Sequence, residues 1–182
     1  TAAVYGDNKN LPIKVSEPYA PASAYGLSKM NFEQHLLSEH RNQSLQTIVL
    51  RYANIYGPRQ GTVGEGGVVA IFCKKLLANE PLTIFGSGVQ TRDFTFVDDV
   101  VESNVLAMNS VKDGVVCNVS TTLETSVNDL AGKLLKISGK NVEIKHVDAG
   151  AGDVMRSALD NSLIKRELGW EPRVGLDEGL EK

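Results

Sequence analysis

The sequence is poor in the features that commit a chain to a disulfide framework, a membrane or a nucleic acid. Only two of its 182 residues are cysteine, and neither Cys73 nor Cys117 has a CxxC partner, so we expect buried free thiols in a reducing compartment. No apolar run approaches the roughly 18 residues that cross a bilayer. A net charge of −3 offers no basic field to nucleic acid. The histidines (His35, His40 and His146) lack metal-ligand spacing, so no metal site is expected.

Also absent is a GxGxxG-type loop, the glycine turn that holds a dinucleotide pyrophosphate at the start of a βαβ unit. The sequence does have a glycine-rich stretch, residues 61–67 (GTVGEGG), ahead of an expected helix. Such a loop can cradle phosphate at a helix N-terminus or can be a flexible connection, and the stretch alone does not decide between the two. The turn at 86–88 (GSG) follows an expected strand and is not predicted to hold phosphate.

What the sequence does contain is an ordinary globular composition, 42% hydrophobic and 23% charged, with alternating strand and helix patterns. That alternation predicts an α/β protein with a parallel sheet. Asp98 and Ser126 are predicted helix caps, and Asp129 would complete a partial capping box. The strands are expected at residues 2–5, 46–52, 82–85, 115–119 and 142–146, and the helices at 22–41, 68–78, 98–109, 126–137 and 162–168.

Tyr25 and Lys29, in the stretch YGLSK, are four residues apart on the helix expected at 22–41. That spacing puts both side chains on one helix face, within reach of a common ligand. An ammonium group beside a phenol favours the phenolate, which makes Tyr25 a plausible proton-transfer group; the alternative is a surface tyrosine next to a solvated lysine. The apolar side chains expected to lie on roughly one face of this helix are Leu27, Met30, Leu36 and Leu37.

The stretch around Tyr25 is one of four that occur in a fixed order. They are residues 1–6 (TAAVYG), 21–29 (PASAYGLSK), 51–59 (RYANIYGPR) and 92–99 (RDFTFVDD). With these motifs the sequence resembles the extended short-chain dehydrogenase/reductase family, and within it the NAD-dependent nucleotide-sugar epimerases of the UDP-glucose 4-epimerase type. The resemblance covers almost the whole chain.

The resemblance implies the second half of a Rossmann-like parallel sheet plus a smaller mixed α/β substrate-binding domain. Residues 1–65, joined by 94–120, would belong to the NAD-binding domain, and residues 66–182 would bind the nucleotide-sugar. The family places its glycine turn before the point where this sequence begins and continues a helix beyond its last residues, so we expect a C-terminal fragment trimmed at both ends. Such a fragment is expected to be inactive, and to self-associate through uncovered strand edges.

The resemblance also implies a cofactor and a mechanism. NAD would take hydride from C4 of a UDP-sugar while Tyr25 takes the proton of the 4-hydroxyl group, and the 4-keto sugar would then turn over and take hydride back. Lys29 would hold the nicotinamide ribose and favour the phenolate, and Thr1 would bridge Tyr25 and the sugar hydroxyl. Three consecutive residues match further positions, Tyr52 and Ala53 at the nicotinamide and Asn54 at the substrate. Without the resemblance, they are a packed strand end and a turn.

A second group of residues would bind the nucleotide. Arg92 matches a diphosphate-binding arginine, a role suited to a bidentate guanidinium, and Asp153 matches an acidic residue at the nucleotide ribose. One departure is Gly150, which occupies a position where the family often has arginine, so a phosphate contact is missing or comes from another residue such as Arg156. The other positions are Gly67 and Val68 near the phosphates, Thr83 and Phe85 at the base, and Asp98 and Asp99 in a structural role.

Ala2 and Ala3 narrow the reaction. Related 4,6-dehydratases carry Asp-Glu at these positions because elimination needs an extra acid and base, and methyl groups cannot transfer protons. C4 epimerisation of UDP-glucose and UDP-galactose is therefore the predicted reaction. The alternative predictions are a decarboxylase, a reductase or an inactive nucleotide-sugar-binding remnant. Ser157 is a small residue at a position that sets the size of the sugar pocket in the family. N-acetylated UDP-sugars are therefore also possible substrates of the predicted enzyme. The complete enzyme is expected to be a cytoplasmic homodimer without nucleic-acid or membrane partners.

Overall fold

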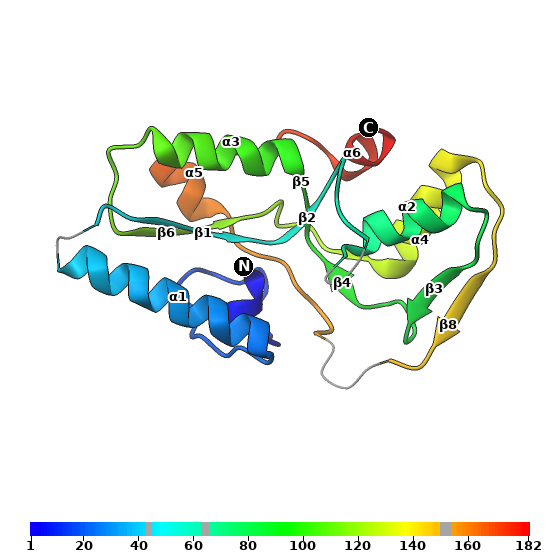
Figure 1. Cartoon of the computed structure of the whole chain (residues 1–182), viewed down its shortest axis with the longest axis horizontal. Helices are drawn as coiled ribbons and strands as arrows, with labels where there is room; N and C mark the ends of the chain where they lie inside the picture. Colours follow the sequence, from blue (N-terminus) through cyan, green and yellow to red (C-terminus); the bar gives the residue numbers. More distant parts are fainter. Residues whose placement is uncertain (43–44, 63–65, 150–153) are drawn as a thin grey trace.

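The computed structural model describes residues 1–42, 45–62, 66–149 and 154–182, which form an α/β fold (Figure 1). In chain order the elements are the 3₁₀-helix η1 (Ala2–Tyr5), α1 (Ala24–Arg41), β1 (Ile48–Tyr52), β2 (Asn54–Tyr56), α2 (Val68–Leu77), β3 (Leu82–Phe85), β4 (Thr91–Arg92), β5 (Phe94–Phe96), α3 (Val97–Met108), β6 (Val115–Val119), β7 (Thr125–Ser126), α4 (Val127–Ser138), β8 (Ile144–Val147), α5 (Ser162–Leu168) and α6 (Leu176–Glu181).

Parallel pairing dominates the strands. β1 pairs with β6, β2 with β5 and β3 with β8, all in parallel, whereas β4 and β7 form a short antiparallel pair. The β1–β6 register runs from Ile48 opposite Val115 to Tyr52 opposite Val119. The α/β class and the parallel strands predicted from the sequence are therefore confirmed.

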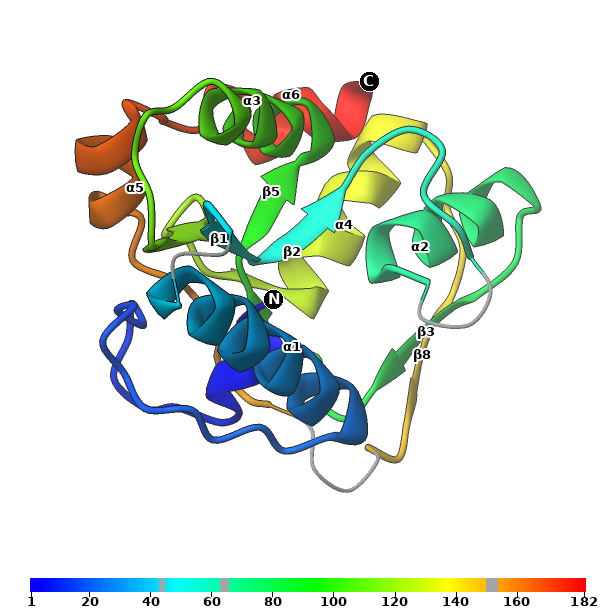
Figure 2. The same ribbon diagram turned by 60° about the vertical axis from the view of Figure 1, so that its left-hand side comes forward.

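Helices cover both faces of the β1–β6 pair, with α1 on one face and α3 and α5 on the other (Figure 1; Figure 2). This arrangement is typical of parallel strands, which are buried on both faces. The cluster between the strands and α3–α5 contains five buried side chains: Val100, Cys117, Val119, Ile164 and Trp170.

A second packed region joins α2 and α4 to β3 and β5, and its largest buried side chains include Phe72, Leu82, Ile84 and Leu130. In Figure 2 the β3–β8 pair lies apart from β1 and β6. The start of α4 follows the predicted capping pattern, because the Ser126 hydroxyl accepts a hydrogen bond from the Asp129 amide and contacts the Asp129 carboxylate at 2.6 Å.

The structure corrects the type of one predicted element and the N-cap of another. Ala2–Tyr5 is a 3₁₀-helix rather than a strand, since the Thr1 side chain accepts a hydrogen bond from the Ala3 amide and so caps a turn. Asp98 does not cap α3: the N-cap is Phe96, and Asp98 lies in the first helical turn, where its charge suits the helix dipole.

The apolar residues predicted to share one face of α1 are not its buried residues. Its only buried residues are Gly26 and Glu33, whereas Leu27 is exposed and Leu36 and Leu37 are half-buried. Met30 alone of the four predicted leucine and methionine positions packs against a core cluster. The helix is therefore held to the rest of the chain by something other than an apolar stripe.

Asp99 has the structural role expected of it. Its buried carboxylate accepts hydrogen bonds from the backbone amides of Arg173 and Val174, both at 3.1 Å, and its carbonyl accepts one from the Trp170 indole at 2.8 Å. These bonds tie the start of α3 to the segment between α5 and α6.

Within the described residues, no helix has the length and apolar character needed to span a membrane. The same part of the chain holds no cluster of three metal-ligating side chains. Cys73 is half-buried and Cys117 is buried, and both are free thiols. His40 pairs with Asp113 at 3.1 Å, and the His146 ring contacts the Gly86 carbonyl at 2.8 Å.

Candidate active site

The chain changes strand partners at Ala53. Before it β1 pairs with β6, and after it β2 pairs with β5. The Ala53 amide donates to the Val119 carbonyl at 3.0 Å, and the Asn54 amide donates to the Asp93 carbonyl at 2.9 Å. Ligands of parallel α/β sheets bind outside the carboxyl ends of strands where neighbouring connections diverge, and Ala53 lies at such a point.

A cavity of about 290 Å³ opens at this point. It gathers six residues that the sequence analysis placed at the cofactor or substrate, drawn from four separate stretches of the chain. They are Thr1, Tyr52, Ala53, Asn54, Arg92 and Ser157.

A second cavity, of about 410 Å³, adjoins the first, since Thr1 and Tyr52 line both. Tyr25 and Lys29 line this second cavity, and the Lys29 ammonium lies 5.5 Å from the centre of the Tyr25 ring. Tyr25 is 40% exposed. Tyr25 and Lys29 thus lie on one side of Thr1 and Tyr52, and Asn54, Arg92 and Ser157 lie on the other.

A close backbone contact brings Thr1 and Tyr25 together. A Cβ at Gly26 would lie 2.6 Å from the Ala3 carbonyl oxygen, so only glycine lets α1 approach η1 this closely. The Thr1 hydroxyl oxygen accepts from the Ala3 amide at 3.3 Å, and among the described residues the hydroxyl donates no hydrogen bond, so its proton can be donated to a ligand oxygen.

Tyr52 is a wall of the site rather than a second base. Its hydroxyl donates to the Asn104 side-chain oxygen at 2.8 Å. Burial raises the pKa of the Tyr52 phenol above its ordinary value, although the hydrogen bond to Asn104 acts in the opposite direction. The phenol is therefore neutral at physiological pH.

Arg92 and Ser157 are held by the segment that follows residue 153. Arg92 donates from Nη1 to the Val154 carbonyl at 2.7 Å, and the Thr91 amide donates to the Met155 carbonyl at 2.9 Å. Ser157, only 9% exposed, faces the first cavity. This segment therefore fixes the positions of the Arg92 and Ser157 side chains at the cavity.

Asp93, beside Arg92, is fully buried and binds the same segment. Its Oδ1 accepts from the amide and the hydroxyl of Thr121, and its Oδ2 accepts from the amides of Thr122 and Leu159. Burial raises the pKa of the Asp93 carboxyl, and these hydrogen bonds oppose that effect. Asp93 belongs to the motif at residues 92–99, but no role was predicted for it from the sequence.

Arg156, suggested as a replacement phosphate ligand, is paired instead with Glu124. Its Nε donates to Glu124 Oε2 at 2.9 Å and its Nη2 donates to Oε1 at 2.5 Å. The Arg156 hydrogen bonds, with one from Thr91, hold the pKa of the Glu124 carboxyl below its ordinary value. This pair fastens the 154–159 segment to the rest of the chain.

We predict a pH dependence for that pair. Because the folded pKa of Glu124 is depressed, its stabilising effect is present above the ordinary carboxyl pKa and is lost as the pH falls through the folded value. The urea midpoints of the wild type and Glu124→Gln should differ at pH 7, and the difference should shrink as the pH falls below the ordinary carboxyl pKa of about 4.3. A constant difference across that range would contradict the assignment.

Other predicted nucleotide contacts lie away from the first cavity. Gly67, Val68, Thr83 and Phe85 do not line it; Thr83 accepts a hydrogen bond from Lys75 at 2.7 Å, and Phe85 is exposed at the end of β3. Asp153 and Gly150 lie outside the described residues. A larger cavity of about 630 Å³, between α2 and α6, contains none of the predicted catalytic residues.

Four further residues line the first cavity although no role was predicted for them: Gly6, Ala22, Ser23 and Val154. A signal was present for three of them, because Gly6, Ala22 and Ser23 lie in the same motifs as Thr1 and Tyr25, and these motifs carry few large side chains. Gly6 has a positive φ of 59°, and a Cβ there would lie 2.0 Å from the Ala20 carbonyl oxygen.

Parallel strands, a cavity at the point where they diverge, and a tyrosine–lysine pair on the adjoining helix are the features of an α/β protein with a candidate ligand site at the carboxyl ends of its strands. Residues 1–120 match the NAD dependent epimerase/dehydratase family. The chain belongs to that family.

Named relatives agree with this assignment. The UDP-glucose 4-epimerase of Mycolicibacterium smegmatis is 40% identical over 180 residues, which are 99% of this chain and 58% of the relative. Among solved structures, a UDP-glucose 4-epimerase of Thermotoga maritima with UDP-glucose is 45% identical with a TM-score of 0.95, over 99% of this chain and 58% of that one. A UDP-N-acetylglucosamine 4-epimerase of Methanobrevibacter ruminantium, in complex with UDP-N-acetylmuramic acid, is 31% identical with the same TM-score, over 100% and 58%. The chain thus spans about 58% of the length of these proteins.

Proposed function

We propose that this site, within a longer protein, catalyses the NAD-dependent epimerisation of a UDP-sugar at C4 through a 4-keto intermediate. The observation that carries the proposal is the pair of adjoining cavities. One holds Tyr25 and Lys29, the other holds Asn54, Arg92 and Ser157, and Thr1 with Tyr52 belongs to both.

The residues of the second cavity fit the nicotinamide end of NAD. Its walls combine Tyr25 and Lys29 with the apolar side chains of β1, including Ile48 and Leu50, which suits a flat ring joined to a ribose. Lys29 would bind the ribose hydroxyls, and Tyr52 and Ala53 would flank the ring. When bound, NAD would supply the hydride acceptor.

The proton transfer falls to this chain's own residues. Tyr25 would take the proton of the sugar 4-hydroxyl group, with the Lys29 ammonium favouring the phenolate. Thr1, whose hydroxyl group can both donate and accept a hydrogen bond, would bridge the tyrosine and the sugar oxygen. Asn54, exposed at the start of β2, would orient the sugar.

The nucleotide would extend from the first cavity towards α2 and β3. Arg92 lies at the cavity wall and suits a diphosphate. Gly67, Val68, Thr83, Phe85 and Asp153 are proposed to complete this half of the site. The parallel pairing of β1 with β6 and of β2 with β5 supports the proposal that residues 94–120 return to a Rossmann-like domain formed with 1–65, with 66–182 as the substrate domain.

The test is a coupled assay of the longer protein with NAD, in which UDP-glucose and UDP-galactose should interconvert without net release of NADH. Conversion to UDP-xylose with loss of CO₂ from UDP-glucuronic acid would instead identify a decarboxylase. Binding of UDP-sugars with no turnover of any of them would identify a binding protein. A homodimer in the cytoplasm stays a prediction.

Ser157 leads to a prediction about substrate size. A serine side chain at the wall of a 290 Å³ cavity leaves room for an N-acetyl group, so we expect kcat/KM for UDP-N-acetylglucosamine within about 10³-fold of that for UDP-glucose. Ser157→Tyr should reduce the N-acetyl substrate's kcat/KM selectively, by about tenfold or more. Equal losses for both sugars would show that Ser157 does not set the pocket size.

We predict no measurable NAD binding by the 182-residue chain alone. The sequence has no GxGxxG turn to hold the pyrophosphate, so the Tyr25–Lys29 cavity would meet only the nicotinamide end of the cofactor. Calorimetric titration of NAD into the chain measures this directly. Saturable binding in the micromolar range would show that the cofactor site is complete without such a turn.

A further inference from the structure

Helix α1, which carries Tyr25 and Lys29, is attached to the molecule at two buried positions. Gly26 touches the η1 backbone, and Glu33 enters the interior, where it is 4% exposed. Residues 26 and 33 are seven apart, two helical turns, so they lie on one line of the helix. Tyr25 precedes the first attachment and Lys29 lies between the two. The setting of the pair relative to the cavity therefore depends on these two contacts.

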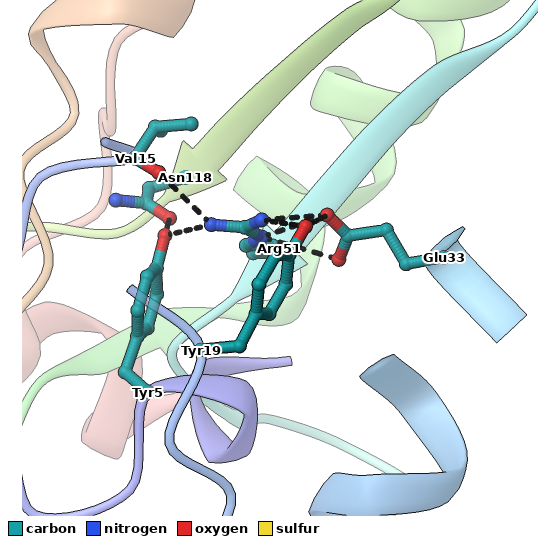
Figure 3. Close-up of polar contacts among 6 residues, drawn as sticks. All are labelled: Tyr5, Val15, Tyr19, Glu33, Arg51 and Asn118. Carbon is teal, nitrogen blue, oxygen red and sulfur yellow. Dashed lines mark hydrogen bonds and ion pairs between the residues drawn. The ribbon is translucent and has the colours of Figure 1, made fainter. Parts of the chain in front are cut away.

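The second contact is a buried ion pair. Arg51, at the end of β1 and 2% exposed, donates from Nη2 to Glu33 Oε1 at 2.6 Å and from Nε to Oε2 at 3.1 Å (Figure 3). A guanidinium that holds both carboxylate oxygens fixes angle as well as distance. Arg51 is followed directly by Tyr52, which lines both cavities.

The remaining polar atoms of the pair are also satisfied. Tyr19 donates to Glu33 at 2.7 Å and accepts from Arg51 at 2.7 Å, and Arg51 also donates to the Tyr5 hydroxyl at 2.5 Å and the Val15 carbonyl at 3.2 Å (Figure 3). The Tyr5 hydroxyl donates in turn to the side-chain oxygen of Asn118 on β6 at 2.7 Å, which extends the network to that strand. The network thus joins α1, η1, the loop before α1, β1 and β6 around one guanidinium.

An apolar contact could also hold α1 against the rest of the chain, without a buried ion pair and its hydrogen-bond network. Buried ion pairs can often be replaced by apolar residues of similar volume without loss of stability, because taking two charges out of water is costly. What apolar residues do not reproduce is the directional, bidentate geometry. The attachment at Glu33 is therefore better suited to fixing a position than to supplying stability.

We propose that Glu33 and Arg51 are positioning residues that set the Tyr25–Lys29 pair against the cavity formed by Thr1 and Tyr52. The catalytic consequence rests on the proposed function, whereas the geometric consequence does not. A displacement of about 1 Å in a reacting group can cost about 10²-fold in rate, so the pair governs turnover through α1 without touching the substrate.

The test uses the double variant Glu33→Leu/Arg51→Met to separate an effect on the position of the Tyr25–Lys29 pair from an effect on the stability of the fold. We expect its urea midpoint to fall only modestly, through the hydrogen bonds that Tyr19 and Val15 lose, while its kcat in the longer protein falls by about 10²-fold and its KM for the UDP-sugar changes less than about threefold. The matched control, Lys165→Met/Glu171→Leu, removes an exposed ion pair between α5 and the segment that follows it, and should change none of these. A double variant that is as stable and as active as the wild type overturns the proposal.

A second measurement needs no activity. Nitroxide labels at His35→Cys on α1 and Val105→Cys on α3, both exposed, report the inter-helix distance in a Cys73→Ser/Cys117→Ala background. We expect a narrow distribution in the parent and a shifted or broadened one in the double variant. If the wild-type protein epimerises nothing, the proposed function fails and this distance still decides the inference: an unchanged distribution overturns it.

Tyr19→Phe covers the case in which the double variant does not fold. It removes a single hydroxyl from the network and keeps the ring over the Arg51 guanidinium, which lies 4.8 Å from its centre. We expect a smaller change in the same direction, with a broadened label distance and a fewfold lower kcat at constant KM. An unchanged distance and kcat in this folded variant would count against the proposal.

Discussion

Tyr25→Phe in the longer protein should lower kcat by at least about 10²-fold while UDP-sugar affinity stays nearly unchanged, because a positioned acid–base group contributes about 10²–10⁴-fold. The physical reason lies in the neighbourhood of the phenol. The Lys29 ammonium is 5.5 Å from the ring centre, and Thr1 lies across the shared cavity wall. Removing one oxygen deletes the proton acceptor and leaves the shape of the cavity as it was.

The measurement is steady-state turnover together with the dissociation constant of UDP, so that chemistry and binding are separated. Tyr56→Phe is the matched control, since it deletes a phenol oxygen that contacts the Leu176 carbonyl at 3.4 Å, away from both cavities. Its kcat should equal that of the wild type. A Tyr25→Phe enzyme with near wild-type kcat would remove Tyr25 from the mechanism.

Asp93→Asn should destabilise the chain by about 3 kcal/mol. The carboxylate accepts three backbone amides and one hydroxyl, and an asparagine offers only one oxygen, so its NH₂ group would face amide donors. Leaving backbone N–H groups without acceptors costs about 1–3 kcal/mol each. Because one of these amides belongs to Leu159, the segment that holds Ser157 should loosen as well.

Urea unfolding measures the effect as a lower midpoint with an unchanged slope. Asp98→Asn is the control, being the same substitution at an exposed carboxylate of the same motif, and should change stability by no more than about 0.5 kcal/mol. If the two variants are equally stable, the four hydrogen bonds to Asp93 contribute little, and the segment around Ser157 is held by other contacts.

The sequence by itself determined the elements whose cause is local. The strands Leu82–Phe85 and Val115–Val119 and the helix Ser162–Leu168 were predicted to the residue, because continuous β-branched or helical patterns are bounded there by polar turns. The cap of α4 also follows from Ser126 and Asp129 alone, three residues apart. The α/β class came from the alternation of such segments, and the family from the order of four motifs.

Only the tertiary structure decided how α1 is attached. Local periodicity predicted an apolar face through Leu27 and Leu36, whereas the buried positions are Gly26 and Glu33. A glutamate is buried only when it is paired, and its partner, Arg51, lies 18 residues away on a strand, beyond the reach of any helical pattern. The strands β2, β4, β5 and β7 were not predicted for a similar reason, since a strand of two or three residues is too short to show a periodic pattern and is fixed by its partner strand.

The two cavities likewise exist only in three dimensions. Thr1, Asn54, Arg92 and Ser157 come from stretches that are tens of residues apart, and they meet because β1 and β2 take different partners on either side of Ala53. The residue types in the motifs specify what chemistry is available. The pairing of the strands, and the buried contacts that hold α1 beside them, decide which of those residues can act together.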